Sequence, residues 1–514
     1  MEVATMEVQN ITFHFFHSAK LYPDKIAIRE GKRCCTYGEL AQDVLRTITY
    51  YRNCGITKGD RVFVFEPMGI DLYRCVLAIF SMGATAVFID EWVKTNRLVT
   101  CCEMAQCKAL IGRTKVRMLS WCFSSFRKIP IYIHPSSMSQ ASSEILNWVE
   151  DDHPALITFT TGSTGIPKAA IRTHGLLQAQ FEALQHETQP LPHDTCLTTL
   201  PIVLLLNLGI GCTSIISVFN SKKPEKLQPS EIIALLNQEK VNRLIASPYF
   251  IEIISQRLIS SHESLPALKN IFTGGAPVFP GDARLFKKAF PSSNIQMVYG
   301  STEAEPISLI SADELLHSTH NDKGLLVGKL STYTRVKIIK MTSYPIVIND
   351  NEFLSDFELT GGEMGEIIVS GSHVLQQYLS NAEAERRNKI KTVEGIWHRT
   401  GDCGYLDHDG NLFLMGRCES MIYLNDDLIS PFLYEQAFKE VNGICIGTVM
   451  LRQGQLTAIV EPHSSTEQEA IRSILLSQFP KLSAVLFLKK IPRDPRHYSK
   501  IDYNLTRIQC GDLY

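Results

Sequence analysis

The feature that most constrains the fold is a regular alternation of strand-like and helix-like segments. Residues 61–66 read RVFVFE, a helical period spans residues 71–83, and residues 85–90 read TAVFID. A strand, a helix and a second strand at this spacing are typical of βαβ units in a parallel sheet. The pattern returns in further short apolar runs, at residues 108–112, 155–160, 242–247, 270–275 and 294–300. The sequence therefore predicts an α/β fold that binds ligands at the carboxyl ends of its strands.

The predicted secondary-structure elements become shorter and more mixed after Gly416. An apolar run at residues 445–451 is followed by a predicted strand at 457–461 and by a helix that a Ser465/Gln468 capping box would open. Shorter elements in this mixture are typical of a small α+β domain. We therefore predict a large multi-sheet N-terminal domain over residues 1–415 and a small C-terminal domain over residues 416–514.

The composition and net charge of the chain limit the kinds of ligand that it is expected to bind. Hydrophobic residues make up 45% and charged residues 20% of the 514 residues, and the formal net charge is -2. A globular protein with so small a net charge is not expected to bind a nucleic-acid backbone or an acidic membrane surface. The first residues lack a basic segment followed by an apolar core, so we expect no secretory signal and a cytoplasmic protein.

The 14 cysteines are scattered along the chain. Neighbours such as Cys34 and Cys35 lack the spacing of a zinc site or of a disulfide framework. We expect reduced thiols.

The stretch from residue 195 to residue 220 carries no charged side chain. Its length matches the roughly 20 residues that a membrane-spanning helix needs. Pro201, Asn207 and the glycines within it favour a different interpretation, in which a buried strand and a following helix form the wall of a pocket. No integral membrane segment is therefore expected, although a span stays open as an alternative.

The strongest local signal is FTTGSTGIPK at residues 159–168, which follows a predicted strand. Such a loop folds backbone N–H groups around phosphate oxygens, while hydroxyl groups and a lysine complete the cradle. The spacing differs from the GxxxxGK[ST] loop of P-loop kinases, so that mechanism does not transfer. The candidate phosphate-binding residues are Thr161, Gly162, Ser163, Thr164, Gly165 and Lys168.

TTGSTGIPK, followed by Thr173, His174 and Gly175, resembles the signature of the adenylate-forming superfamily. That family includes acyl-CoA synthetases, nonribosomal adenylation domains and firefly-type luciferases. The resemblance implies that the loop handles the β- and γ-phosphates of ATP.

Two further segments resemble signatures of the same family in the same order. The resemblance implies that Gly275, Ala276 and Pro277 flank adenine. In VYGSTE at residues 298–303, it implies that Tyr299 stacks on adenine, and Gly300 and Ser301 belong to the same motif. It also implies that Thr302 meets a phosphate and that Glu303 holds Mg²⁺, for which a carboxylate is a suitable ligand.

The C-terminal third completes the resemblance. It implies that Asp402 of RTGD grips the ribose hydroxyls and that Arg417 meets ribose or phosphate. Lys500 of IPRDPRHYSKID occupies the place of the family's essential lysine, which neutralises charge as the acid attacks the α-phosphate. The C-terminal domain would be a mobile lid that pivots at Glu419.

The chain departs from the family's pattern near the channel that CoA ligases use for their thiol. Tyr423 stands where a basic residue is usual, Asp426 replaces a glycine, and Asn207 stands where a histidine is common. These departures resemble the branch that includes olefin-pathway β-lactone synthetases, which close a 3-hydroxyacyl-adenylate on itself. Transfer to CoA or to a carrier-protein thiol stays open as the alternative. A third hypothesis is that the protein has the same fold and binds nucleotide as a sensor or scaffold without catalysing a reaction.

The resemblance also places the acyl pocket beside the uncharged stretch. We expect its wall to include Leu204, Asn207, Gly209 and Ala304. An apolar wall favours a fatty or 3-hydroxy fatty acid as the carboxylic acid.

Overall fold

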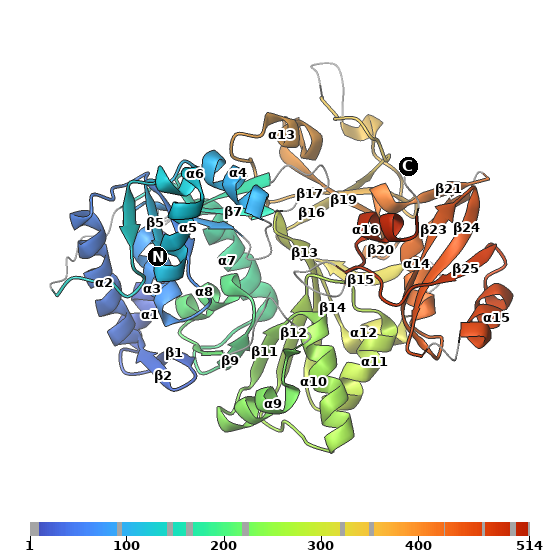
Figure 1. The fold of residues 1–514 in the computed structure, drawn as a ribbon, viewed down its shortest axis with the longest axis horizontal. Helices are drawn as coiled ribbons and strands as arrows, with labels where there is room; N and C mark the ends of the chain where they lie inside the picture. The colour runs from blue at the N-terminus through green and yellow to red at the C-terminus, as the bar shows by residue number, and fades with distance from the viewer. Residues whose placement is uncertain are drawn as a thin grey trace, which may run out of the picture.

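The computed structural model describes residues 10–89, 95–140, 148–160, 168–217, 226–318, 324–348, 354–425, 427–464, 468–493 and 500–511. Figure 1 shows a large body built from the blue to orange elements and a smaller, dark orange to red body formed by the C-terminal elements. The predicted α/β class, with a large multi-sheet N-terminal part and a small α+β part, is confirmed.

One sheet of the large body has six strands in the order β6-β5-β3-β4-β7-β8. Its strands are β3 (Arg61–Phe65), β4 (Thr85–Ile89), β5 (Ala109–Gly112), β6 (Ile131–Ile133), β7 (Pro154–Thr160) and β8 (Lys168–Thr173). All pairings are parallel except that of β8 with β7, so the predicted βαβ units are present. The helix α3 (Ile70–Ser81) between β3 and β4 is buried on every side except at Asp71, as its nearly continuous apolar sequence requires.

The second sheet has 14 strands. Its parallel part runs through β1 (Ile26–Glu30), β10 (Thr213–Ile216), β9 (Thr195–Thr198), β11 (Arg243–Ala246), β12 (Asn270–Gly274) and β13 (Asn294–Ser301). The sheet continues in antiparallel fashion through β14 (Ala304–Ser311), β15 (Leu325–Leu330), β20 (Asn411–Arg417), β19 (Gly395–Leu406), β17 (Gly365–Ser370) and β16 (Arg335–Ile339). β2 (Arg33–Thr36) and β18 (Lys389–Thr392) complete it.

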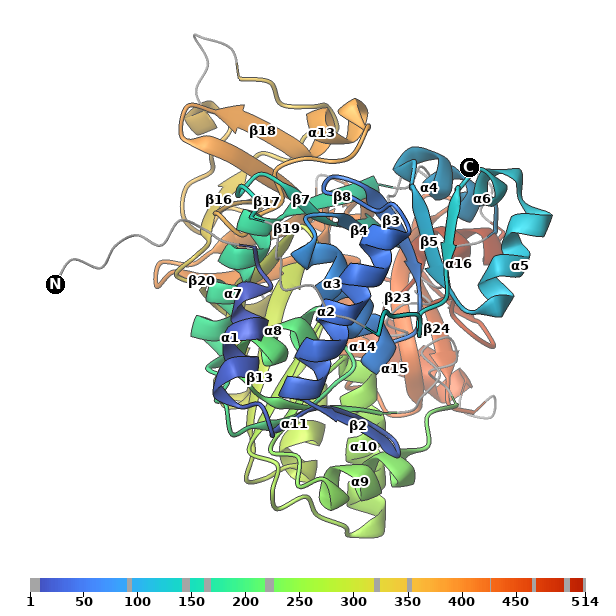
Figure 2. The ribbon, with the colours of Figure 1, turned by 90° about the vertical axis from the view of Figure 1, so that its left-hand side faces the viewer.

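Helices cover both sheets. α7 (His174–Thr188) contacts both β8 and β14 and so lies between the sheets, as Figure 1 shows. α2 (Tyr37–Asn53) and α3 pack side by side on the N-terminal face (Figure 2). The other helices of the large body are α1 (Phe13–Leu21), α4 (Thr95–Ala105), α5 (Thr114–Cys122), α6 (Ser124–Arg127), α9 (Pro229–Gln238), α10 (Pro248–Ser261), α11 (Pro280–Ala289), α12 (Ala312–His317) and α13 (Ala382–Asn388).

The uncharged stretch forms β9, α8 (Pro201–Ile210) and β10, which is the predicted strand and helix. Pro201 opens α8, and Gly211 ends it with a φ of 96°, a conformation that glycine adopts without strain. Among the described residues, no helix has both the length and the apolar character that a membrane crossing would require.

The C-terminal part has its own hydrophobic core. It consists of the hairpin β21 (Ile422–Leu424) and β22 (Asp427–Ile429), the three-stranded sheet β23 (Ile444–Arg452), β24 (Gln455–Pro462) and β25 (Ala484–Phe487), and the helices α14 (Pro431–Phe438), α15 (Gln468–Gln478) and α16 (Tyr503–Gln509). The predicted run and strand correspond to β23 and β24. The predicted helix begins at Gln468, while Ser465 lies outside the described residues.

Candidate active site

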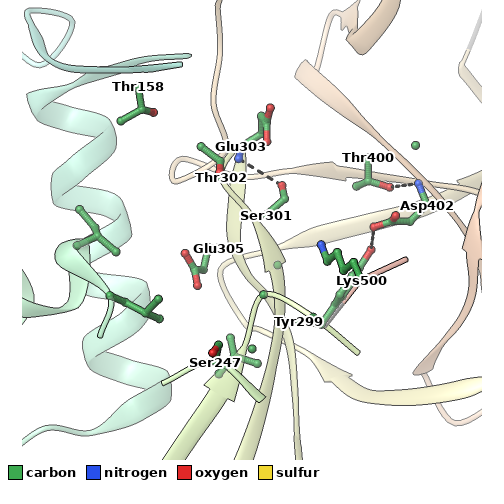
Figure 3. Close-up of a pocket in the computed structure, with 18 of the residues that line it drawn as sticks. Thr158, Ser247, Tyr299, Ser301, Thr302, Glu303, Glu305, Thr400, Asp402 and Lys500 are labelled. Atoms are coloured by element: carbon green, nitrogen blue, oxygen red, sulfur yellow. Dashed lines mark hydrogen bonds between the residues drawn. The ribbon is translucent and has the colours of Figure 1, made fainter. Parts of the chain in front are cut away.

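A large cavity, of about 2390 Å³, lies where the carboxyl ends of β12 and β13 meet β19, β20 and the segment that begins at residue 500. The predicted nucleotide-binding and catalytic residues that the structure describes all line it: Lys168, Gly275, Ala276, Pro277, Tyr299, Gly300, Ser301, Thr302, Glu303, Asp402, Arg417 and Lys500. Figure 3 labels Tyr299, Ser301, Thr302, Glu303, Asp402 and Lys500 among them. The other predicted phosphate-binding residues, Thr161, Gly162, Ser163, Thr164 and Gly165, lie outside the described residues.

At one end of the cavity, Asp402 accepts hydrogen bonds from two neighbours. The hydroxyl of Tyr299 donates to its Oδ2 at 2.7 Å, and the Arg417 guanidinium donates to its Oδ1 at 2.9 Å. Asp402 and Arg417 face each other in the register of β19 and β20, so the backbone pairing holds them together. Burial, together with the adjacent Asp402 carboxylate, raises the pKa of Tyr299, so its hydroxyl stays a neutral donor. The group offers an aromatic ring, a carboxylate and a guanidinium, a set that suits a nucleoside.

The turn between β13 and β14 carries Thr302 and Glu303. The main chain of this turn is fixed because Arg172 donates to the Thr302 carbonyl at 2.9 Å and the Leu375 N–H donates to the Glu303 carbonyl at 2.7 Å. Gly300 has no room for a side chain, since an added Cβ would lie 2.9 Å from the Ala304 carbonyl oxygen. The tight turn therefore presents its side chains at a defined place in the cavity.

The Glu303 carboxylate is a suitable ligand for Mg²⁺. It lines the cavity, and one of its oxygens accepts a hydrogen bond from the Tyr378 hydroxyl at 3.3 Å. A carboxylate in a cavity that is also lined by cationic side chains matches the preference of Mg²⁺ for one or two protein oxygens together with phosphate oxygens. Within the described residues no cluster of three or more metal-ligating His, Cys, Asp or Glu side chains occurs.

Lys168 stands at the first position of β8, on the other side of the same cavity. Its ammonium donates to the Asn388 amide oxygen at 3.2 Å and lies 5.9 Å from the ring centre of Tyr378. Burial lowers the pKa of this lysine. Lys168 thus adds a partly desolvated positive charge near the carboxylate of Glu303.

Lys500 reaches the cavity from the C-terminal part, and Figure 3 shows it with Tyr299 and Asp402. The two residues that follow Lys500 are fixed by main-chain and side-chain contacts. Ile501 forms a bridge with Arg493, and the side chain of Asp502 caps α16 by accepting from the Leu505 N–H at 2.9 Å. Glu419, the predicted pivot, lies in the short helical turn Cys418–Ser420 and also lines the cavity.

The four residues predicted for the acyl pocket are not among the residues that line this cavity, and their part in binding an acyl group stays a prediction. On α8, Leu204 and Asn207 lie on the face that packs into the interior, where Asn207 donates to the Ser214 hydroxyl at 3.2 Å. Gly209 lines a separate cavity of about 50 Å³, and Ala304 points into the core of the large sheet.

The periodicity of side chains along a helix and a strand explains why neighbouring residues, and not the predicted ones, line the cavity. The opposite face of α8 supplies the apolar wall, and Glu305, one residue beyond Ala304 on β14, faces the cavity because successive strand residues alternate. The apolar side chains at this end of the cavity are Leu72, Val76, Phe80, Ile202, Val203, Leu205 and Leu206.

The sequence analysis also missed three polar residues around Glu303, namely Arg172, Tyr378 and Lys389. Lys389 is 4% exposed, its ammonium donates to the Leu375 carbonyl, and burial lowers its pKa to about 7. No motif marks these residues. The three residues come from two distant parts of the chain, so only the tertiary structure brings them together. The structure places no disulfide among the cysteines that it describes, and the expected reduced thiols stay a prediction.

Comparison with known proteins supports the geometry. The sequence model of the family described as AMP-binding enzyme matches residues 15–379. Olefin beta-lactone synthetase from Stenotrophomonas maltophilia is 25% identical, with 96% of each chain covered. Feruloyl-CoA synthase from an Amycolatopsis species is also 25% identical, covering 86% of this chain and 87% of its own.

Among solved structures, O-succinylbenzoate coenzyme A synthetase from Bacillus subtilis, in complex with ATP and magnesium ion, has a similar fold. The TM-score is 0.77 at 20% identity, and the similarity covers 97% of this chain and 99% of that one. Both parts of the fold, and not only the large body, are thus shared with that structure.

Proposed function

Because the chain belongs to the AMP-binding enzyme family and is an AMP-forming acid ligase, we propose that it activates an aliphatic carboxylic acid with ATP. Pyrophosphate leaves, and the acyl-adenylate stays in the large cavity. One observation carries this proposal: candidate residues from six separate parts of the chain, from Lys168 to Lys500, line that one cavity.

The proposed roles follow from the position and chemistry of each side chain. Tyr299 stacks on adenine beside the 275–277 loop, while Asp402 and Arg417 bind ribose. Thr302, Lys168 and the 161–165 loop bind the phosphates. Mg²⁺, held by Glu303 when bound, would neutralise phosphate charge. The Lys500 ammonium meets the acid and the α-phosphate as the carboxylate attacks phosphorus and pyrophosphate departs.

The lid assignment is part of the same proposal. We assign residues 1–415 to the N-terminal domain and 416–514 to a lid that pivots at Glu419. The orientation in which Lys500 lines the cavity suits adenylate formation, since the ammonium is delivered to the reacting groups.

The acid is proposed to be a fatty or 3-hydroxy fatty acid. Its aliphatic chain would lie along the apolar face of α8 and the facing side chains of α3, such as Val76 and Phe80. The similarity to an olefin beta-lactone synthetase and the exposed Tyr423 favour β-lactone closure as the second step. In that step the 3-hydroxyl oxygen forms a bond to the acyl carbon, the bond from that carbon to the phosphate oxygen breaks, AMP leaves, and the hydroxyl proton passes to solvent.

Transfer to a thiol of CoA or of a carrier protein is the second candidate, favoured by the similarity to a CoA synthase. The two are separated by incubating the protein with ATP and either 3-hydroxy or unsubstituted acids, with and without CoA, and analysing products by mass spectrometry. A lactone from 3-hydroxy acids alone supports closure, whereas a thioester that requires CoA supports transfer.

The acid-activation step has its own test in acid-dependent pyrophosphate release. Lys500→Ala should lower the rate by about 10² to 10³ because it removes the charge that stabilises the transition state. Lys489→Ala, which removes an exposed lysine just outside the same loop, is the matched control and should keep the wild-type rate. ATP binding without pyrophosphate release from any acid would instead indicate a silent sensor or scaffold, and an unchanged rate in Lys500→Ala would contradict the role of that residue.

A further inference from the structure

The segment 375–378 donates hydrogen bonds to both the main chain and the side chain of Glu303. The Leu375 N–H donates to its carbonyl at 2.7 Å, and the Tyr378 hydroxyl donates to its Oε1 at 3.3 Å. Since Oε1 is engaged by Tyr378, the rotation of the carboxylate is restricted and Oε2 is left for another ligand. The position of Glu303 therefore depends on a segment that lies outside the sequence motifs described above.

Lys389 in turn anchors that segment. Its ammonium donates to the Leu375 carbonyl and lies 5.5 Å from the ring centre of Tyr378. Lys168 lies 5.9 Å from the same ring, so the tyrosine interacts with a cation from β18 and with one from β8. The ring thus links the phosphate-side lysine with the buried lysine.

The burial of Lys389 calls for a specific reason. The side chain is 4% exposed, and the carboxylates whose charges act on its ammonium are those of Glu303 and Glu385. Burying a cation in this way costs free energy, and the Leu375 carbonyl, the Tyr378 ring and these two carboxylates offset that cost only in part, because the pKa of Lys389 is still lowered. A methionine of similar length would fill the space without this cost, which indicates that the charge serves the adjacent site.

We propose that Tyr378 and Lys389 are positioning residues that hold the Glu303 carboxylate in the orientation required for Mg²⁺-dependent nucleotide binding. Lys389 does not line the cavity, so it acts through Leu375 and Tyr378 and not by touching the nucleotide. The inference rests on the proposed function, because it takes Mg-ATP as the ligand of the cavity.

The test is a calorimetric comparison of ATP affinity with Mg²⁺ and with a chelator, so that it does not depend on turnover. The ratio of the two affinities reports how well Glu303 is placed for the metal. Tyr378→Phe removes one hydrogen bond and should lower this ratio by about three- to tenfold. Lys389→Met should lower it by at least as much, while both variants keep the wild-type affinity for ATP without metal within about twofold.

Two matched variants serve as controls. Lys391→Met removes an exposed lysine two residues further along β18, and Tyr405→Phe removes the hydroxyl of a tyrosine on β19 that stacks on Phe413. Both should leave the ratio unchanged. The role in positioning is overturned if Tyr378→Phe and Lys389→Met melt like the wild type and retain its ratio. If Lys389→Met does not fold, Tyr378→Phe decides alone. A wild-type protein that binds no ATP contradicts the proposed function itself, which is a different outcome.

Discussion

At the scale of single residues, the Asp402 carboxylate bonds to neighbouring side chains and still has acceptor positions for a ligand. Each carboxylate oxygen offers two acceptor positions. Tyr299 occupies one position on Oδ2 and Arg417 one on Oδ1, so each oxygen keeps one for a further donor. Two vicinal ribose hydroxyls are the donors that this pair of free positions fits.

Asp402→Asn is therefore expected to weaken ATP binding by about 10- to 100-fold, because hydrogen bonds to a charged acceptor are lost. The informative measurement is the affinity for ATP relative to 2′-deoxy-ATP and 3′-deoxy-ATP. The wild-type protein should prefer ATP, and the variant should lose most of that preference. Asp409→Asn, on the exposed turn before β20, should keep it. A variant that binds weakly yet retains the full preference would show that Asp402 does not contact the ribose.

At the scale of elements, the contact between α14 and α16 supports the loop that carries Lys500. Glu435 on α14 accepts hydrogen bonds from the Tyr503 hydroxyl and from the Thr448 hydroxyl, the latter at 2.8 Å. Burial raises the pKa of Glu435 to about 7, and these two hydrogen bonds oppose the shift without cancelling it. The carboxyl is thus neutral below neutral pH and poorly solvated above it.

The sign of the pH effect follows from the raised pKa. The unfolded chain loses this proton near pH 4.5, whereas the folded protein keeps it to about pH 7. The stabilisation is therefore full below pH 4.5 and falls as the pH rises through 7, by at most about 3 kcal/mol. Glu435→Gln, which stays neutral, should flatten this decline. Melting temperatures of both proteins between pH 5 and pH 8 test it, and parallel curves would contradict the assignment.

The elements also show what the sequence could and could not predict. Strands such as β3, β4 and β13 were predictable because each is a short apolar run next to a turn, and motif residues such as Tyr299 lie at the ends of such strands. The pocket residues on α8 were not predictable, because an uncharged helix shows no amphipathic pattern from which its cavity face could be read. Lys389 was missed for the opposite reason, since a lysine is expected at the surface and only the tertiary structure shows it buried.

At the scale of the whole molecule, two ion pairs connect the C-terminal part with α11 of the large body. Lys439 lies 2.9 Å from Asp282, and Arg284 donates to Glu440 at 2.6 Å. Both pairs are partly or largely exposed, so each is expected to contribute about 0.2 to 1 kcal/mol and to weaken as salt screens the charges. They stabilise the orientation in which Lys500 lines the cavity, without fixing the lid there.

An Arg284→Ala/Lys439→Ala variant should therefore form the adenylate about two- to fivefold more slowly, because a smaller fraction of molecules holds this orientation. Both substitutions leave Asp282 in place, which matters because its side chain accepts from the Phe279 N–H at the start of α11. The decisive measurement is the initial rate of pyrophosphate release as ionic strength rises. The wild-type rate should fall with salt, whereas the rate of the variant should be low and nearly independent of it. Arg257→Ala, which breaks an exposed pair within the large body, should behave like the wild type. If the double variant keeps the salt dependence of the wild type, these pairs do not set the lid equilibrium, and the orientation must be held by the apolar contact of Phe279 with Phe432 across the same boundary.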